Sequence, residues 1–323
     1  MATSFKTLKP EDIQTTRTNL HEAIPVTGSI VSGTYSENNI KNYSHGMFQS
    51  VYDFPYLSSS ANHIFDLTAG LSSDSALSGA LCVQVDQKMQ IYNELAQVLV
   101  GHDVTGAIEQ FDEDGNFASA TDKMKECIFI NVARLLSKDE VKKGTFSLVM
   151  NVDPHATPTS SALTKQVVVT DKSGSDGFRV NSPAGEYGIL YASGSSSTGL
   201  GVMANNIEPP CGLLFYQAGV VVLTGSLFKV ENSGGLLKDA LVDQSGSAGK
   251  IQMHPNDSTL TAGDDGIDEL LQLTTISSSA DAMRQRMNNL SFNNTTELNS
   301  TVYFCRANSR EFNYSSNPTY LSQ

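Results

Sequence analysis

The amino-acid sequence predicts an α+β fold: a β-rich central region forming an antiparallel sheet, a few amphipathic helices, and extended N- and C-terminal arms. Three observations support this fold class. Short apolar or alternating runs separated by Gly, Ser, Pro and Asn fill the middle of the chain, which is typical of antiparallel sheets. One segment near residue 90 has helical periodicity. Both ends are polar and carry scattered aromatic residues without a regular period.

Residues 1–68 are predicted to form an extended N-terminal arm with at most short strands. Residues 12–46 are polar and are interrupted by Pro25, Gly28 and Gly33. Residues 47–68 are rich in aromatic side chains, and we expect these to contact the surface of a partner. Packing into the chain's own core is the alternative. The candidate partner-binding residues of this arm are Phe48, Tyr52, Phe54 and Tyr56.

Residues 69–144 are predicted to be the mainly helical part. Apolar residues recur at three- and four-residue spacing between Asp86, the expected N-cap, and Gly101, the expected left-handed stop. A second helix is expected over residues 121–137, because apolar side chains there also fall on one helical face. Residues 112–116, Asp-Glu-Asp-Gly-Asn, predict a turn between the two helices.

Residues 145–310 are predicted to be β-rich with two or more short helices. Residues 211–216 and 220–223 flank Gln-Ala-Gly and are expected to form a hairpin. Helices are expected at residues 234–242 and 280–289. Residues 311–323 have no period and are predicted to be an extended tail. The expected strands cover residues 145–152, 165–170, 186–192, 212–216, 220–224, 227–230, 290–296 and 298–306.

Charge and targeting features exclude several classes of partner. The formal net charge of −13 would repel a phosphate backbone, so no nucleic-acid partner is expected. No apolar run is long enough for a membrane span, and the N-terminus lacks the pattern of a secretory signal. We therefore expect a chain that is neither exported nor membrane-spanning and that is made in a reducing cytoplasm. The cysteines, expected there as buried free thiols, are Cys82, Cys127, Cys211 and Cys305.

The sequence contains no recognisable motif for catalysis or cofactor binding. The acidic run at residues 112–114 begins like a calcium loop, but Phe117 stands where such a loop needs glycine and Lys123 where it needs glutamate. The six histidines are scattered without metal-ligand spacing. Residues 194–199 lack a nucleophile elbow, and residues 246–250 lack the hydroxyl residue of a phosphate-binding loop. We expect no enzyme activity, no cofactor and no metal.

Three stretches carry a resemblance to a known class of proteins. They are residues 16–35 with their continuation 39–67, the block Gly-Leu-Leu-Phe-Tyr-Gln-Ala-Gly-Val-Val-Val-Leu-Thr at 212–224, and residues 302–320. Together they resemble virion structural proteins of large contractile-tailed, myovirus-type bacteriophages, particularly those of marine hosts. The resemblance covers about a quarter of the chain.

The resemblance implies a structural component of the contractile tail. Within the tail, the baseplate or tail-end region is the favoured location. A neck or collar component and a fibre-attachment module are the alternatives, followed by a tail-associated hydrolase. The implied location is the virion, after synthesis in the host bacterial cytoplasm. The implied partners are other phage structural proteins and copies of the same chain.

The irregular aromatic ends suit such assembly, because a segment that cannot bury its apolar residues locally becomes ordered on a neighbouring subunit. The alternative is that both ends fold back on their own domain. In the tail, the candidate partner-binding residues are Phe312, Tyr314, Pro318 and Tyr320.

Overall fold

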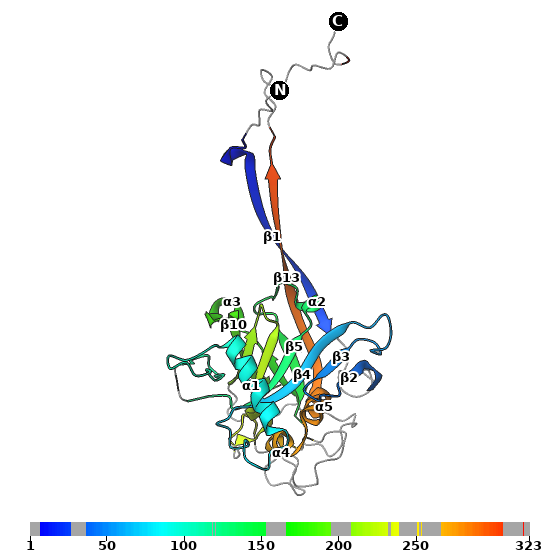
Figure 1. Ribbon diagram of the computed structural model, residues 1–323, viewed down its shortest axis with the longest axis vertical. Coiled ribbons are helices and arrows are strands. Elements are labelled where there is room, and N and C mark those ends of the chain that lie inside the picture. The colour runs from blue at the N-terminus through cyan, green and yellow to red at the C-terminus, as the bar shows by residue number, and fades with distance from the viewer. Residues whose placement is uncertain are drawn as a thin grey trace. The chain divides into compact units, whose positions relative to one another are not determined.

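The chain has the predicted α+β fold, with one large antiparallel sheet and several helices (Figure 1). This computed structural model describes residues 7–26, 37–117, 119, 121–152, 166–194, 208–231, 234–238, 251, 253, 266–305 and 319. The α-helices of this part are α1 (Val85–Leu99), α2 (Arg134–Ser137), α3 (Gly174–Gly177), α4 (Ile267–Leu273) and α5 (Ile276–Arg286).

The strands of the described residues are numbered in chain order. They are β1 (Ile13–Val26), β2 (Ile40–Asn42), β3 (Gln49–Tyr52), β4 (His63–Leu71), β5 (Glu126–Val132), β6 (Glu140–Val141), β7 (Ser147–Asn151), β8 (Gln166–Thr170), β9 (Arg179–Ser182), β10 (Gly185–Gly194), β11 (Pro210–Phe215), β12 (Val220–Thr224) and β13 (Met287–Tyr303).

The chain divides into two compact units. The larger unit comprises residues 21–295, and the smaller unit comprises residues 1–20 together with 296–323. Both β1 and β13 contribute residues to each unit. The sequence pattern, which divides the chain at residues 68, 144 and 310, does not predict this grouping of the two chain ends.

The sheet follows the order β1-β13-β7-β8-β10-β11-β12-β5-β4-β3-β2, with β6 beside β13 and β9 beside β10. The predicted hairpin is confirmed as β11 and β12, in which Leu214 pairs with Val221. Gly219 has a φ of +69° in the connecting turn, a value that glycine adopts easily. The strands expected at 145–152, 165–170 and 186–192 are confirmed as β7, β8 and β10.

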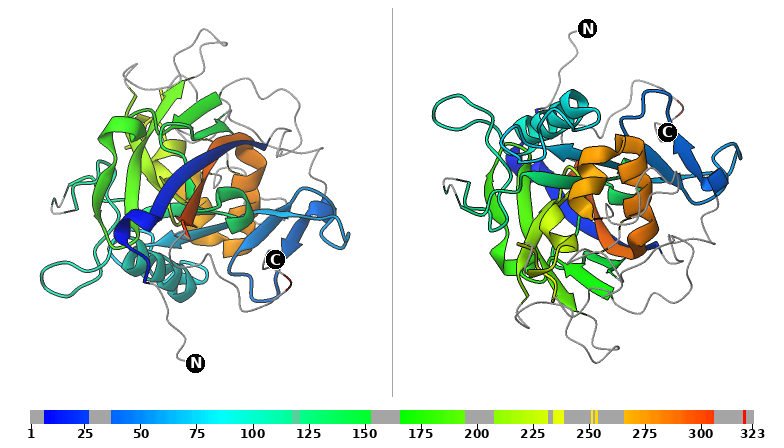
Figure 2. Two further views of the ribbon diagram at one scale, coloured as in Figure 1. Left: turned by 90° about the horizontal axis from the view of Figure 1, so that it is seen from above. Right: turned by 90° about the horizontal axis from the view of Figure 1, so that it is seen from below.

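Both faces of the central strands of the larger unit are buried. In β5, Ile128 and Ile130 belong to one apolar cluster, whereas Cys127 and Phe129 belong to another. Since neighbouring residues of a strand point to opposite faces, the two clusters lie on opposite sides of the sheet. Helix α1 contributes to the cluster of Phe129, and α4 and α5 contribute to the other (Figure 2).

The prediction for α1 is confirmed, with a different N-terminus. The helix begins at Val85 after Gln84, which has a left-handed φ of +54°, so Asp86 lies in the first turn rather than at the cap. Gly101, with a φ of +98°, follows the helix as expected. The helix expected at 280–289 is α5, which begins earlier because the side chain of Thr275 accepts a hydrogen bond from the backbone of Ser278.

The helix predicted over residues 121–137 is wrong. Residues 126–132 form β5, and only Arg134–Ser137 are helical. A strand that is buried on both faces has a continuous apolar run, and such a run contains helical spacing by coincidence. The β-branched residues Ile128, Ile130 and Val132 favour the strand.

Four further expectations are corrected. The N-terminal arm contains a 14-residue strand, β1, rather than short strands alone. Residues 225–228, which overlap the first two residues of the strand expected at 227–230, form a 3₁₀-helix. The strands expected at 290–296 and 298–306 are one continuous strand, β13. Residues 234–238 are not helical, with a φ of +76° at Gly234, and residues 239–242 lie outside the described part.

Candidate functional site

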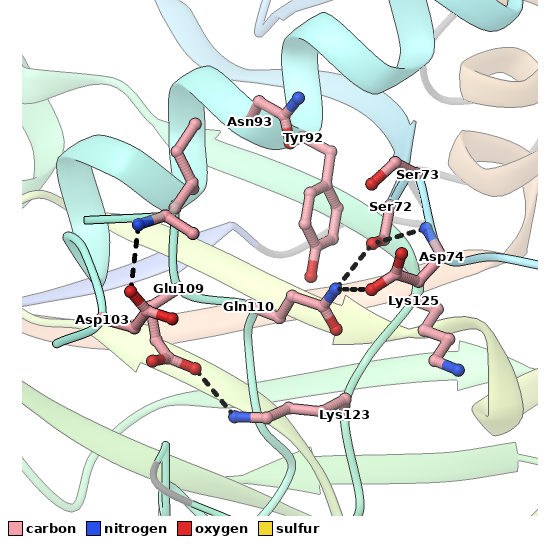
Figure 3. A pocket seen from close by; sticks show the side chains of 12 residues that line it. Ser72, Ser73, Asp74, Tyr92, Asn93, Asp103, Glu109, Gln110, Lys123 and Lys125 are labelled. Carbon is pink, nitrogen blue, oxygen red and sulfur yellow. Dashed lines mark hydrogen bonds and ion pairs between the residues drawn. The ribbon is translucent and has the colours of Figure 1, made fainter. Parts of the chain in front are cut away.

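A cleft of about 590 Å³ opens on the side of the sheet that carries α1 (Figure 3). We call it the α1 cleft. Its walls come from the end of β4, from α1 and from the segment that joins α1 to β5. The lining residues are Ser72, Ser73, Asp74, Tyr92, Asn93, Asp103, Ala107, Ile108, Glu109, Gln110, Lys123 and Lys125.

Hydrogen bonds and an ion pair join several of the lining residues of the α1 cleft (Figure 3). The amide nitrogen of Gln110 donates to Asp74 at 2.6 Å and to the hydroxyl of Ser72 at 3.1 Å. The ammonium group of Lys123 lies 3.1 Å from the carboxylate of Glu109. These contacts hold the walls of the cleft together.

The base of the α1 cleft is part of the core. The hydroxyl of Tyr92 donates to the carbonyl of Met124 at 2.8 Å and accepts from the backbone N–H of Phe111 at 3.2 Å. Burial raises the pKa of Tyr92 well above its usual value. Tyr92 is therefore a structural residue that is neutral over the physiological pH range.

The acidic run at residues 112–116 bends the chain as predicted, with a φ of +72° at Gly115, but it lies between α1 and β5 rather than between two helices. One carboxylate oxygen of Asp112 accepts from the backbone N–H groups of Asp114 and Asn116 at 3.1 and 3.2 Å. Burial, followed by a side-chain hydrogen bond that the protonated Asp112 donates to Asp114, raises the pKa of Asp112 to about 6. Burial also raises the pKa of Glu113 to about 7. The nearest cation is Lys123, 3.5 Å from Asp112.

The lining of the α1 cleft holds no serine–histidine or cysteine–histidine pair, and its carboxylates come from Asp74, Asp103 and Glu109. Ser72 accepts a hydrogen bond from an amide, and the lining contains neither histidine nor cysteine. Within the described ranges, no three His, Cys, Asp or Glu side chains converge so that they could hold a metal ion. Among the same residues Cys82, Cys127 and Cys211 are buried free thiols, as expected, whereas Cys305 is exposed.

The structure places the predicted aromatic residues of the N-terminal arm around β3. Phe48 is half-buried, with its ring centroid 4.7 Å from that of Tyr43. Tyr52 lies close to Tyr56, with ring centroids 6.4 Å apart. Phe54 and Tyr56 are exposed, so the arm keeps two rings available for contact. The other four candidates, Phe312, Tyr314, Pro318 and Tyr320, lie outside the described residues.

A second exposed feature is the two-stranded ribbon of the smaller unit. It consists of residues 13–20 of β1 and 296–303 of β13, which run side by side (Figure 1), and we call it the terminal ribbon. The backbone N–H of Phe304 donates to the carbonyl of Asp12 at 2.8 Å at its far end. An ion pair joins Arg17 to Glu297 across the two strands.

Both faces of the terminal ribbon are exposed, and both carry apolar side chains. Alternation along each strand places Leu20, Leu298 and Val302 on the face opposite to the Arg17–Glu297 pair. These three side chains are 52%, 49% and 45% exposed. Ile13 and Tyr303 are exposed on the face of the ion pair. The terminal ribbon thus has no buried face among its described residues.

A ribbon of this kind is weakly stable by itself. Two strands without a packed face are marginal in water, since fixing each residue costs roughly 1–2 kcal/mol of backbone entropy. Its sixteen residues contain one Arg and one Glu but no Lys or Pro, the residues that usually protect a strand edge from pairing. The terminal ribbon therefore has the properties of an assembly surface.

Sequence reasoning missed the terminal ribbon as a site, although a signal was present. Seven of its sixteen residues are Ile, Val or Thr, which favour strands. The pairing of residues 13–20 with 296–303 joins positions almost 300 residues apart, and no local pattern identifies such partners. The aromatic residues of the sequence point to contact segments at residues 48–56 and 312–320 instead.

No helix of the described residues is long and apolar enough to cross a membrane. Comparisons with protein-family models, with curated proteins and with solved structures found no match to this chain.

Proposed function

We propose that this protein is a structural subunit of a bacteriophage virion that assembles through protein–protein contacts. The observation that carries the proposal is the terminal ribbon, whose strands expose apolar side chains on both faces. An extended surface of this kind gains stability by pairing with and packing on a neighbour. A low proportion of charged residues, 17%, also suits a chain that forms many intermolecular contacts.

The resemblance of residues 16–35 with their continuation 39–67, of residues 212–224 and of residues 302–320 to virion structural proteins supports a place in a contractile tail. Two of these stretches overlap the terminal ribbon, and the third is the hairpin of β11 and β12 in the core. We propose the baseplate or tail-end region as the location. A neck or collar component and a fibre-attachment module would use the same kind of surface.

A substitution on the exposed face of the terminal ribbon tests the proposal. Val302→Asp places a charge where a partner would bury an apolar side chain, so the variant should be lost from particles. Val302 is exposed in the isolated chain, and its melting temperature should therefore stay close to that of the wild type. Val104→Asp is the matched control, because Val104 is fully exposed in the larger unit.

The measurement is peptide mass spectrometry of gradient-purified particles of the phage that encodes the chain. We expect the wild type and Val104→Asp in the particles and Val302→Asp only in the cell lysate. Absence of the wild-type chain from purified particles would contradict the virion role. Normal incorporation of Val302→Asp would contradict the role of the terminal ribbon in it.

A further inference from the structure

We infer that copies of this chain pair through their terminal ribbons, β1 of one copy beside β13 of the next, to form a closed antiparallel β-barrel. The inference rests on the proposed function and names the partner of the same surface. It follows from the direction of the two strands, from the backbone groups at their outer edges and from their charges.

Among the described strands, none pairs with the outer edge of either strand of the terminal ribbon. β1 is the first strand of the sheet, so no other described strand pairs with its outer edge. In β13, the carbonyls of Asn293 and Thr295 accept hydrogen bonds from Lys142 and Asp139, on the side away from β1. The N–H of Phe304 points toward β1. The backbone N–H and C=O groups of odd-numbered residues of β13 therefore point away from β1. After Thr295, no described strand pairs with these groups.

The two open edges belong to strands that run in opposite directions. Asp12 lies opposite Phe304 and His21 contacts Thr295, so β1 and β13 are antiparallel. When β1 of one copy lies beside β13 of the next, the antiparallel alternation continues from copy to copy. Each copy supplies two strands, and a ring of copies closes the sheet without a free edge. About four copies would supply about eight strands, at which number side chains just fill the interior of a barrel.

The charges of the two strands favour this pairing over the symmetric ones. Within the terminal ribbon, β1 carries a single charge, from Arg17, and β13 carries a single opposite charge, from Glu297. Pairing β1 with β13 of a neighbour brings opposite charges to the same interface. Pairing β1 with β1, or β13 with β13, brings like charges together, which is unfavourable, and leaves two edges open.

Charge also favours a second copy over a strongly charged partner. The chain as a whole has a net charge of −13, whereas the sixteen residues of the terminal ribbon have one positive and one negative charge. The terminal ribbon is therefore a neutral and self-complementary part of an acidic chain. Copies can meet there with the least electrostatic repulsion.

Proline at Thr301 tests the inference. Thr301 is an odd-numbered residue of β13, so Thr301→Pro removes an outward N–H and leaves the ladder to β1 intact. Thr301→Val keeps this N–H and is the matched control. We expect light scattering at micromolar concentration to give the purified wild type and Thr301→Val a single mass of several chains. Thr301→Pro should be monomeric, with a thermal transition close to that of the control.

Hydrogen exchange of the wild-type chain provides a second readout that needs no substitution. Amides of residues 297–303 should exchange more slowly in the assembled sample than in a dilute, dissociated one, and should not be slowed in Thr301→Pro. A wild type that stays monomeric, or a Thr301→Pro variant that forms the same assembly, would overturn the inference.

The failure of this inference is distinguishable from the failure of the proposed function. If particles contain the chain and incorporate Thr301→Pro normally while the purified protein is monomeric, the self-pairing is wrong and the virion role stands. If the purified protein forms the ring but particles lack the chain, the virion role is wrong and the self-pairing stands.

Discussion

Lys88 is an unusual buried residue, because its ammonium group has carbonyl partners rather than a carboxylate. Its side chain is fully buried and donates to the carbonyls of Leu271 and Thr274 at 2.5 and 2.8 Å. These carbonyls lie at the C-terminal end of α4, where a positive charge is favourable. Lys88 thereby joins α1 to α4. Burial nevertheless lowers its pKa to about 8.

The lowered pKa of Lys88 predicts a pH dependence of stability. An unfolded lysine has a pKa of about 10.4, so between pH 8 and that value the unfolded chain binds more protons than the folded chain. The free energy of unfolding should therefore rise with pH in this window, by up to about 3 kcal/mol from this group. Urea denaturation of the wild type and Lys88→Met across the window measures the difference.

Lys125→Met is the control for Lys88, since Lys125 is exposed and its removal should leave the pH profile unchanged. A difference in free energy of unfolding between the wild type and Lys88→Met that is constant from pH 7.5 to 10 would show that Lys88 titrates as an ordinary lysine.

Val221 and Val222 in β12 test the burial of both faces of the sheet. Both side chains are fully buried, but Val221 belongs to the cluster of Ile128 and Val222 to that of Phe129. Each of Val221→Asp and Val222→Asp should lower the free energy of unfolding by at least about 3 kcal/mol, because each buries an unpaired carboxyl group. Val180→Asp on β9, where Val180 is 69% exposed, should have little effect in the same denaturation experiment.

At the scale of elements, the contact between α1 and β4 depends on Gly70. A Cβ atom at Gly70 would lie 3.0 Å from the backbone of Lys88 and of Tyr92, and 3.1 Å from the ring of Phe129. Gly70→Ala should therefore push α1 away from β4 and lower the free energy of unfolding by about 1–3 kcal/mol. In Gly79→Ala, the control, the new Cβ meets no atom within 4 Å. Equal melting temperatures for the two variants would contradict the close packing of α1.

An element could be predicted from the sequence where the residues that determine it are neighbours in the chain. Helix α1 has apolar residues on one face and polar residues on the other, and the hairpin of β11 and β12 is closed by a short turn with Gly219, so neighbouring residues determine both. Strand β5 lies between β4 and β12, and both of its faces are buried. Its sequence is therefore a continuous apolar run, which contains the three- and four-residue spacing of a helix by coincidence. Its partners are distant in the chain, and no window around residue 128 contains them.

For the candidate site, the sequence predicts that the chain ends make contacts, but it does not predict which residues form the contact surface. Contact segments at the chain ends were expected from aromatic residues, and Phe54 and Tyr56 are indeed exposed. The terminal ribbon depends on pairing between residues 13–20 and 296–303, and its exposed face depends on the strand register. Alternation in a Thr- and Asn-rich strand hardly distinguishes one face from the other, so the sequence does not indicate which side chains meet a partner.

At the scale of the whole molecule, we assign different roles to the two units. The larger unit accounts for the stability of the fold, and the terminal ribbon, with its exposed apolar residues, is the proposed assembly surface. The larger unit contains both apolar clusters, and its sheet supplies a core for independent folding. In the proposed assembly, the terminal ribbon gains its stability from neighbouring chains. This division predicts that substitutions such as Val302→Asp alter assembly without altering the melting of the isolated chain.

Cryo-electron microscopy of the purified particle tests this account most directly. We predict density for many copies of the chain, in which residues 13–20 and 296–303 lie between strands of neighbouring chains and Leu20, Leu298 and Val302 are covered. Density in which both edges of the terminal ribbon face solvent would contradict the account, as would a particle without density for the chain.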